Sequence, residues 1–576
     1  MSGPLAYTTV HPLVTIEAAL TVAAVLVAVY GRTGGAWARK SKLALARISG
    51  STTRSVLLAG APVVLLRLAV LPWQGVPVPG VHDEFSYLLA ADTFASGRLT
   101  NPPHPIWVHF ETFHVIHKPT YASIYPPAQG LALAAGKIIF GHPWAGVWLS
   151  CVLLACAVCW MLSAWLPPPW PLIGAVLLAI RLCTFSYWIN SYWGGSVAAI
   201  GGALVSGAVL RLRHRQTVAN ALVLATGISI LAASRPYEGL VLCLASAVPV
   251  TAWAFRARGY EAARWRRRVL LAVVAVLAFA GALMSYYQWR VTGNPFLMPH
   301  VLNQRMYATS SPFVWQSPPA KPVYRHRTME AMYSDYYAGY ERIRTPRGFV
   351  TESLTRVAEL WLFYLGPVLS LPLLAFCRLR DDRVRLLLWT CAAGTVAILV
   401  TTYFRPHYFA PFLAATYGVL IAGLRQLSAF RSRKVRWGLA VAGAVPVICM
   451  VMLVLRIAAD PLKIPYRDEW RATWYNTPRG NVARARLLEQ LRHSGAQHLV
   501  IVRYDDNHWL HEEWVYNDAD IDHSAVVWAR DMGASANRDL VAYYRSRMIW
   551  LLRPDRRPLR LEPYPDPNGT SRSERP

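Results

Sequence analysis

The sequence predicts a mainly α-helical polytopic membrane protein: a bundle of about twelve transmembrane helices followed by a small extracytoplasmic α/β domain. Three observations predict this fold class. Hydrophobic residues make up 54% of the 576 residues and charged residues only 16%, yet the formal net charge is +28, and long apolar runs recur as far as residue 458. A soluble protein this basic would suggest a nucleic-acid partner. So few charges in so apolar a chain indicate a membrane protein instead.

Each predicted span is an apolar run close to the ~20 residues that a helix needs to cross a hydrocarbon core of ~30 Å. The first run has no basic region before it, so we expect a retained helix and not a cleaved signal. The twelve runs are 11–30, 55–72, 144–166, 170–189, 194–210, 217–234, 237–255, 269–289, 357–377, 386–403, 408–424 and 438–458.

The charge distribution supports this count and orients the bundle. Five connections together hold 24 Lys/Arg against 3 Asp/Glu, namely 31–54, 211–216, 256–268, 378–385 and 425–437. All five fall on one side if twelve spans alternate. The positive-inside rule places that side in the cytoplasm. The sequence therefore predicts a multi-pass protein of the bacterial inner membrane with both termini outside, and the basic surplus does not indicate nucleic acid.

Three predicted outer segments are too long to be simple connectors: 73–127, 290–356 and the tail 459–576. We accordingly divide the chain into an N-terminal span with a basic linker (1–54), a transmembrane domain (55–458) and the tail. The 290–356 segment, rich in Tyr, is expected to be an ordered polar lid with some helix. The tail lacks long apolar runs and is nearly neutral, which favours a separate extracytoplasmic domain.

Shorter elements are predicted in these outer segments. Residues 84–97 have the spacing of an amphipathic helix along the membrane, and 128–141 form a second interfacial or re-entrant piece. In the tail, strands alternate with helices, which is typical of a small α/β domain with a frayed end at 563–576. The expected helices are 482–493 and 537–546, and the expected strands are 498–504, 524–529 and 548–552.

Two adjacent carboxylates, Asp83 and Glu84, follow the second span on the outer face. Together they can supply a general base and a second acceptor that orients a substrate or holds a divalent cation. The alternative is a helix N-terminus, since Asp83 suits a cap and Glu84 suits a first turn. Residue type alone favours that alternative.

The order of several short segments resembles the GT-C superfamily of polyprenyl-phosphate-sugar-dependent glycosyltransferases. The segments are the outer Asp-Glu pair, Tyr87, a Gly97-Arg98 break and Y-P-P-A-Q-G-L at 125–131. S-R-P-Y-E-G at 234–239 and F-R-P-H-Y-F-A-P-F at 404–412 fit the same pattern. The RgtA/B/C/D-like group and the aminoarabinose and protein-mannosyl transferases are the most similar. The resemblance covers about residues 55–430, and the first helix and the tail lie outside it.

The resemblance implies transfer of a sugar from a polyprenyl-phosphate-linked donor to an acceptor hydroxyl on the outer face, by inverting single displacement. The acceptor would be a glycan, a lipid or a protein. Asp83 maps onto the catalytic carboxylate of the superfamily, with Glu84 beside it. The outer cations that could bind the donor phosphate are Lys118, Arg235, Arg405 and His407, and the substrate-binding candidates are Tyr87, Tyr125 and Glu238.

Other polar residues have simpler interpretations. Arg235 and Arg405 could be ordinary snorkelling residues, and Glu238 could form a structural pair with Arg235. Arg67 and Arg181 lie within predicted spans, so each needs a carboxylate, a carbonyl or a lipid phosphate as partner. Five side chains of the first outer loop could suggest a transition metal, but their spacing matches no standard site: His104, His109, Glu111, His114 and His117. A divalent cation, Mg²⁺ or Mn²⁺, is the one cofactor left open.

Two rival functions remain. An O-antigen ligase or polymerase also has many spans and a lipid-linked donor, and would place its site in the 290–356 loop. A secondary transporter would need paired halves and polar groups near the midplane. The sequence shows neither feature, since the candidate groups gather at one face.

Overall fold

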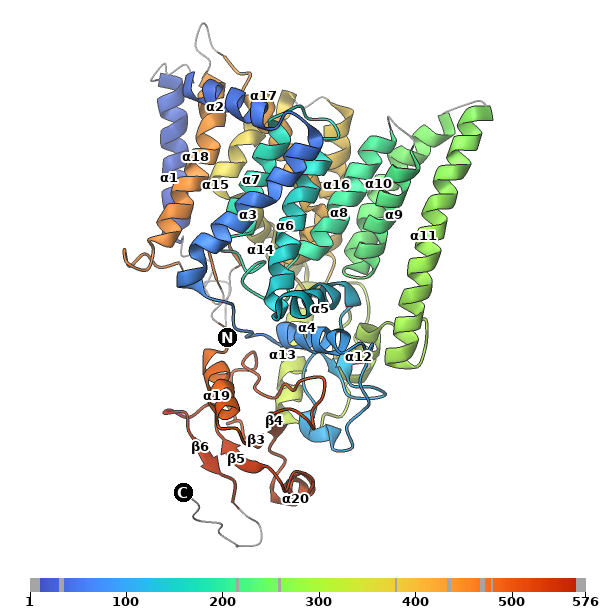
Figure 1. Ribbon diagram of the computed structural model, residues 1–576, viewed down its shortest axis with the longest axis vertical. Coiled ribbons are helices and arrows are strands. Elements are labelled where there is room, and N and C mark those ends of the chain that lie inside the picture. Colours follow the sequence, from blue (N-terminus) through green and yellow to red (C-terminus); the bar gives the residue numbers. More distant parts are fainter. Residues whose placement is uncertain are drawn as a thin grey trace.

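The structure, a computed structural model, describes residues 11–30, 36–213, 217–256, 260–378, 381–431, 437–466, 472–477 and 480–565. Long helices run side by side through one part of the molecule (Figure 1). Two shorter helices, α4 (His82–Ala95) and α5 (Pro127–Phe140), lie across one end of these long helices. Beyond them lies the C-terminal domain. The order is therefore bundle, crosswise layer and domain.

Every one of the twelve predicted spans contains a helix. The helices are α1 (Pro12–Tyr30), α3 (Thr52–Gln74), α6 (Pro143–Leu162), α7 (Trp170–Leu182), α8 (Ser196–Leu212), α9 (Val218–Ala232), α10 (Pro236–Arg256), α11 (Tyr260–Thr292), α14 (Pro346–Leu360) with α15 (Gly366–Ser370), α16 (Asp382–Leu399), α17 (Leu413–Leu427) and α18 (Trp437–Ile457). Among the described residues, seven helical stretches are long and apolar enough to cross a membrane by length and composition. Three of the remaining helices, α7, α8 and α9, have 13, 17 and 15 residues.

The predicted span 170–189 is wrong beyond Leu182. Residues 183–195 form turns and bends instead of continuing the helix. Their polar groups are paired inside the protein: the Trp144 indole donates to the Ile189 carbonyl over 2.8 Å, and the Asn190 amide donates to the Ser186 carbonyl over 3.1 Å. Irregular backbone is tolerated at membrane depth when it is buried in protein, and an apolar composition alone does not reveal such pairing.

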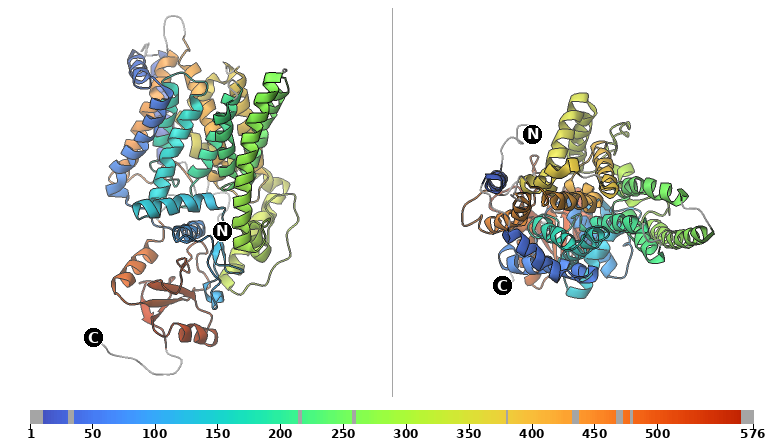
Figure 2. Two further views of the ribbon diagram at one scale, coloured as in Figure 1. Left: turned by 45° about the vertical axis from the view of Figure 1, so that its right-hand side comes forward. Right: turned by 90° about the horizontal axis from the view of Figure 1, so that it is seen from above.

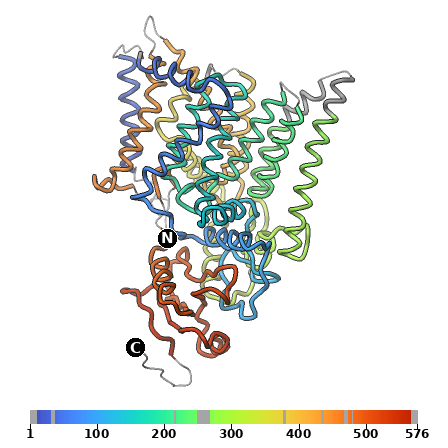
Figure 3. The backbone as a smooth tube through the Cα atoms, in the orientation of Figure 1, coloured from blue at the N-terminus to red at the C-terminus, as the bar shows by residue number. Residues whose placement is uncertain are grey.

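One helix was not predicted. α2 (Ala36–Ile48) lies within the basic linker and crosses the ends of the spanning helices, at the end of the bundle opposite α4 (Figure 2). It packs closely on α18, because a Cβ added to Gly443 would lie 2.6 Å from the Cβ of Ala38. The described parts of the five basic connections lie at this same end (Figure 3). The parts of these connections at 31–35, 214–216, 257–259, 379–380 and 432–436 lie outside the described residues.

The outer segments contain helices as well as loops. The predicted crosswise pieces are confirmed as α4 and α5, and Gly141, with a φ of 77°, ends α5 in the left-handed conformation before α6 begins. The 290–356 segment contains α12 (Pro299–Tyr307), α13 (Arg327–Arg344) and the start of α14. A short hairpin in the first segment pairs β1 (Val115–Ile116) with β2 (Ala122–Ser123).

The C-terminal domain is the predicted small α/β domain. The expected helices and strands are present, with shifted ends in some cases, as α19 (Val482–His493), β3 (His498–Val502), β4 (Val526–Arg530), α20 (Ala534–Tyr543) and β5 (Met548–Leu552). β3 is central and parallel to both β4 and β5, and an unpredicted β6 (Leu561–Pro563) pairs antiparallel with β5. Residues 566–576 of the expected frayed end lie outside the described residues.

The domain is joined to the crosswise layer by a shared core. Because side chains alternate along a strand, Leu499 and Ile501 of β3 pack with Phe85 and Leu89 of α4. The other face of the sheet packs against α19. The connection is also close at the backbone: a Cβ added to Gly80 would lie 2.7 Å from the Cα of Gly480. The chain just before α4 is therefore held by the chain that enters the domain.

The two arginines predicted to need partners within the spans both have them. The Arg181 Nη1 donates to the Glu17 Oε2 over 2.9 Å, and both side chains are buried. The Trp474 indole donates to the same carboxylate oxygen over 3.3 Å. Arg67 donates to the Asn190 side chain over 2.9 Å and to the Gly75 carbonyl over 2.8 Å. Neither charge is available to a lipid phosphate.

Candidate active site

The N-terminus of α4 is organised by Glu84. Its Oε2 accepts the backbone N–H groups of Gly80 over 2.8 Å and Val81 over 3.1 Å, and its Oε1 accepts that of Tyr192 over 3.1 Å. The side chain is buried, and this burial raises the pKa of Glu84 to about 7 against the opposing effect of the three hydrogen bonds. Both carboxylate oxygens therefore hold backbone, and Glu84 faces the protein interior.

The neighbouring carboxylate has a different environment. The Asp83 side chain is 25% exposed, and the Tyr125 hydroxyl donates a hydrogen bond to its Oδ1. The His114 Nδ1 lies 3.0 Å from that hydroxyl and 3.7 Å from the Asp83 Oδ1. Tyr87, one helical turn after Asp83, stacks on Tyr125 with ring centroids 4.3 Å apart. Asp83 is thus fixed on one side and open to solvent on the other.

The groups that hold Asp83 are neutral donors at pH 7. Burial raises the pKa of Tyr125 well above its ordinary value, and the nearby charge of Asp83 raises it further. Burial lowers the pKa of His114, although Asp83 opposes that shift. The arrangement matches a chain in which the His114 Nδ1 donates to the phenol oxygen and the phenol donates to the carboxylate.

Two arginines from different segments influence side chains that Asp83 also influences, and the first is Arg235. The Arg235 guanidinium lies 4.2 Å from the ring centroid of Tyr408, and its Nη1 lies 4.0 Å from the Glu238 Oε1. Burial raises the pKa of Tyr87, while the charge of Arg235 lowers it and that of Asp83 raises it. Arg235 and Asp83 are therefore both close enough to Tyr87 to act on its pKa.

Arg405 is the second arginine. Its side chain is exposed and makes no hydrogen bond or ion pair with any described residue. Burial lowers the pKa of His511, the charge of Arg405 lowers it further, and that of Asp83 opposes both. Burial raises the pKa of Tyr336 on α13, the charge of Asp83 raises it further, and the charge of Arg405 lowers it. Arg405 is thus a cation without a carboxylate partner among the described residues, and it acts on two of the same side chains as Asp83.

The remaining predicted cations have different positions. His407 is buried, and its Nδ1 lies 3.0 Å from the hydroxyl of Tyr187, which also accepts the backbone N–H of His407 over 3.0 Å. It fixes the short helix Pro406–Phe412 that carries Tyr408. Lys118 is exposed, with its Nζ 5.1 Å from the ring centroid of Trp107. No contact between described residues links Lys118 to Asp83, Arg235 or Arg405.

Four residues near Asp83 were not among the predicted site residues: His114, Tyr336, Tyr408 and His511. Tyr408 stands within the F-R-P-H-Y segment, and His114 and Tyr336 stand in outer clusters of the same residue type. His511 has no signal in the sequence, because it comes from the tail. The tail is seated there by His82, whose Nε2 donates to the Leu510 carbonyl over 2.8 Å and whose Nδ1 accepts from the Tyr516 hydroxyl over 2.8 Å.

The side chains that the structure describes around Asp83 and in the first outer loop do not form a metal site. The five side chains considered in the first outer loop separate: His104 pairs with Asp522 at 3.1 Å, and Glu111 accepts from Tyr307 over 2.6 Å. In the described part of the chain, no group of three or more His, Cys, Asp or Glu side chains is placed to hold a metal ion. Glu84 faces backbone amides and Glu238 faces Arg235. Asp83 is left as a single carboxylate.

No family model matches this chain, and no curated protein matches it. It is similar to solved structures of the oligosaccharyltransferase of Archaeoglobus fulgidus, called AglB. One, tethered with an acceptor peptide, is 14% identical over 81% of this chain and 63% of that chain, with a TM-score of 0.45. Another, in complex with Zn and sulfate, is 14% identical over 87% and 67%, with a TM-score of 0.48. The chain thus spans 63% of the length of the first of these structures.

The chain is also similar to ArnT from Cupriavidus metallidurans bound to undecaprenyl phosphate, with 12% identity over 86% of this chain and 92% of that chain and a TM-score of 0.45. AglB and ArnT are both GT-C glycosyltransferases. That is the superfamily which the order of sequence motifs resembles. All three TM-scores lie below 0.5, so the function is inferred from the site itself.

Proposed function

We propose that this protein is a GT-C-type glycosyltransferase that transfers a sugar from a polyprenyl-phosphate-linked donor to an acceptor hydroxyl on the outer face of the membrane. The observation that carries the proposal is the Asp83 carboxylate. It is partly exposed, hydrogen-bonded through Oδ1 to Tyr125, and shares its surroundings with the unpaired Arg405. A base beside a free cation suits a reaction that removes a proton while a phosphate leaves.

The reaction is a single displacement at the anomeric carbon. The acceptor oxygen forms a bond to that carbon as the bond from carbon to the phosphate oxygen breaks, so the configuration inverts. The acceptor proton passes to Asp83, and the bonding electrons leave with the polyprenyl phosphate. Tyr125 occupies Oδ1 and leaves Oδ2 to accept the acceptor hydroxyl. Its hydrogen bond fixes the rotation of the carboxylate, which favours the reactive geometry.

The leaving phosphate gains negative charge as it departs, and cations stabilise that charge. Arg405 is the main phosphate ligand in this proposal, because it is exposed and has no carboxylate partner among the described residues. Arg235 contributes a second positive charge and is oriented by Glu238 and Tyr408. His407 positions this segment through Tyr187. Lys118 has no direct part, and no step requires a metal ion.

The finer assignments follow from the same site. Tyr87 and Tyr125 form an aromatic wall against which a sugar ring can pack. The tail shapes the acceptor side through His511. The acceptor is a glycan, a lipid or a protein. The site faces the extracytoplasmic side of a bacterial inner membrane in this proposal, which the basic connections at the opposite end of the bundle support.

The test is Asp83→Asn, assayed as transfer of labelled sugar from a polyprenyl-phosphate donor in membranes. Loss of a general base typically costs ~10² to 10⁴ in rate. The matched control is Asp92→Asn on the same helix. Asp92 lies away from the site, and its Oδ1 is 2.6 Å from the Lys137 Nζ. Unchanged transfer by Asp83→Asn would refute the assignment of the base.

Two other outcomes would favour the rival functions. Transfer only from a diphosphate-linked donor, with Asp83→Asn fully active, would favour an O-antigen ligase or polymerase. Uptake of sugar by sealed vesicles without any transfer would favour a transporter.

A further inference from the structure

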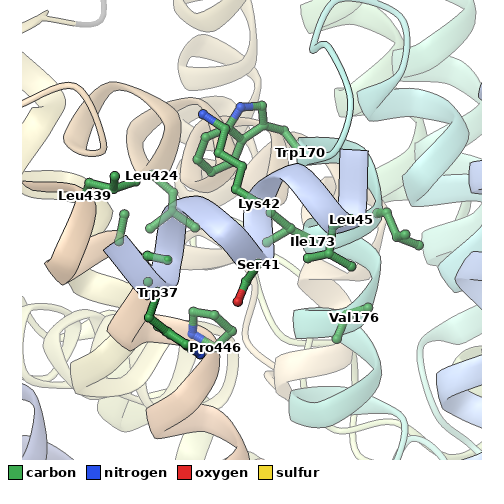
Figure 4. A pocket seen from close by; sticks show the side chains of 14 residues that line it. Trp37, Ser41, Lys42, Leu45, Trp170, Ile173, Val176, Leu424, Leu439 and Pro446 are labelled. Carbon is green, nitrogen blue, oxygen red and sulfur yellow. The ribbon is translucent and has the colours of Figure 1, made fainter. Parts of the chain in front are cut away.

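A cavity of about 160 Å³ lies beside α2 at the end of the bundle opposite Asp83. α2, α7, α17 and α18 supply its walls, and Figure 4 shows their side chains converging on it. The lining is almost wholly apolar, with Trp37, Ile173, Val176 and Pro446 among its members. Its one charged member is Lys42, whose Nζ lies 4.8 Å from the ring centroid of Trp170.

A second cavity, of about 390 Å³, adjoins the first. Lys42 and Leu439 line both, so the two spaces meet at the Lys42 side chain. The second cavity is basic: Arg39 and Arg431 join Lys42, with the Ser428 hydroxyl as a further polar group. An apolar space thus lies next to a cationic one, and the two share Lys42 and Leu439 as lining residues.

The cations that line these cavities lack carboxylate partners among the described residues. Burial lowers the pKa of Lys42, and the nearby charge of Arg425 lowers it further. Within the described residues, none of Arg39, Lys42, Arg425 and Arg431 forms an ion pair with a carboxylate. Clustered like charges repel one another, so an anion in the basic cavity would relieve that repulsion.

We propose that the two neighbouring cavities together bind one anionic phospholipid of the cytoplasmic leaflet. The phosphate occupies the basic cavity between Arg39, Lys42 and Arg431, and part of an acyl chain enters the apolar one. A volume of 160 Å³ equals about five water molecules at ~30 Å³ each, which suits a short length of chain. The site is separate from the proposed catalytic centre and does not depend on the proposed function.

The position of α2 favours a lipid over a soluble anion. α2 is a short basic helix with Trp37 59% exposed, as in helices that lie in the membrane interface. Gly443 seats it directly on α18. Juxtamembrane basic residues on the cytoplasmic side attract anionic lipids. A bound lipid would therefore fasten α2 to α7 and α18 by touching all three.

The first test measures lipid binding by native mass spectrometry of the full chain, exchanged into detergent with phosphatidylglycerol or phosphatidylcholine. The wild type should retain phosphatidylglycerol in preference. The double variant Lys42→Gln/Arg431→Gln should bind it roughly 25-fold more weakly, at about fivefold per basic residue near a membrane surface. The control Lys40→Gln/Arg47→Gln removes the same charge from α2 at positions outside both cavities. An equal loss in this control, or no preference between the lipids in the wild type, overturns the proposal.

The second test separates a lipid from a free phosphate. Ser41→Leu fills part of the apolar cavity without changing its charge, and should weaken phosphatidylglycerol binding while the thermal unfolding midpoint stays within a few degrees. Inorganic phosphate at millimolar concentration should not displace the lipid. Displacement by phosphate, or unchanged lipid binding by Ser41→Leu, would show a simple anion site and overturn the lipid assignment.

Discussion

Replacing Glu84 with Gln tests whether the second carboxylate of the Asp-Glu pair is structural. The pKa of Glu84 is about 7 in the folded protein, against an ordinary value of 4.5. Between these pH values the folded state holds a proton that the unfolded state has lost. Folding therefore takes up a proton, and stability falls as the pH rises through this range, by roughly 3 kcal/mol in total at ~1.4 kcal/mol per pH unit.

Gln is neutral at every pH, so Glu84→Gln should lose this pH dependence. It should also lose an acceptor, because its NH₂ group must face one of the backbone N–H groups that the carboxylate accepts, at a cost of about 1–3 kcal/mol. The variant should therefore be clearly less stable than the wild type near pH 5, and the gap should close near pH 8.

The assay is the thermal unfolding midpoint in detergent, followed by tryptophan fluorescence at pH 5 and pH 8. Glu489→Gln, at an exposed position of α19, is the matched control and should follow the wild type at both pH values. A gap between wild type and Glu84→Gln that stays constant from pH 5 to pH 8 would show that Glu84 does not carry the raised pKa.

Three further substitutions probe the site and the bundle. Tyr125→Phe removes a charge-assisted hydrogen bond to Asp83 that is worth about 1.5–3 kcal/mol, so kcat should fall roughly 10- to 100-fold. An unchanged kcat would show that Tyr125 does not orient the base. Arg405→Gln should raise the KM for the donor about tenfold, because removing one charge from the phosphate site costs ~1.4 kcal/mol or more of binding free energy. Arg405→Lys should recover part of this loss. An unchanged KM would place the phosphate elsewhere. Arg181→Met should cost about 3–5 kcal/mol by leaving Glu17 buried and unpaired. The added change Glu17→Gln should restore much of the unfolding midpoint, and a further loss would contradict this explanation.

The sequence predicted what depends on local patterns. Apolar runs located a helix in each of the twelve spans, and the Lys and Arg residues of the connections sorted them onto one end of the bundle. A short continuous apolar run located β3, whose two faces pack on different cores.

The rest depends on which segments meet in space. Asp83 and Glu84 are adjacent, so a helix points them in different directions, but only packing decides which one is buried. Lys118 was assigned to the correct end, yet nothing local indicates that it lies over Trp107. The sequence did not predict α2, because a short basic helix resembles a linker. It predicted too long a helix for α7, because the residues after Leu182 pair their polar groups with distant residues instead of continuing the helix. His511 reaches the site only through the docking of the tail.

The buried carboxylate of Glu17 joins three parts of the chain with separate origins in the sequence. Arg181 belongs to the region that resembles the GT-C superfamily, whereas Glu17 lies in the first helix and Trp474 lies beyond the last span. Deleting the first helix would leave the buried Arg181 without its carboxylate partner. Deleting the chain around Trp474 would remove the indole that hydrogen-bonds to Glu17. The first helix and the chain beyond the last span are thus bound to one shared charge, so the loss of either segment should destabilise the other.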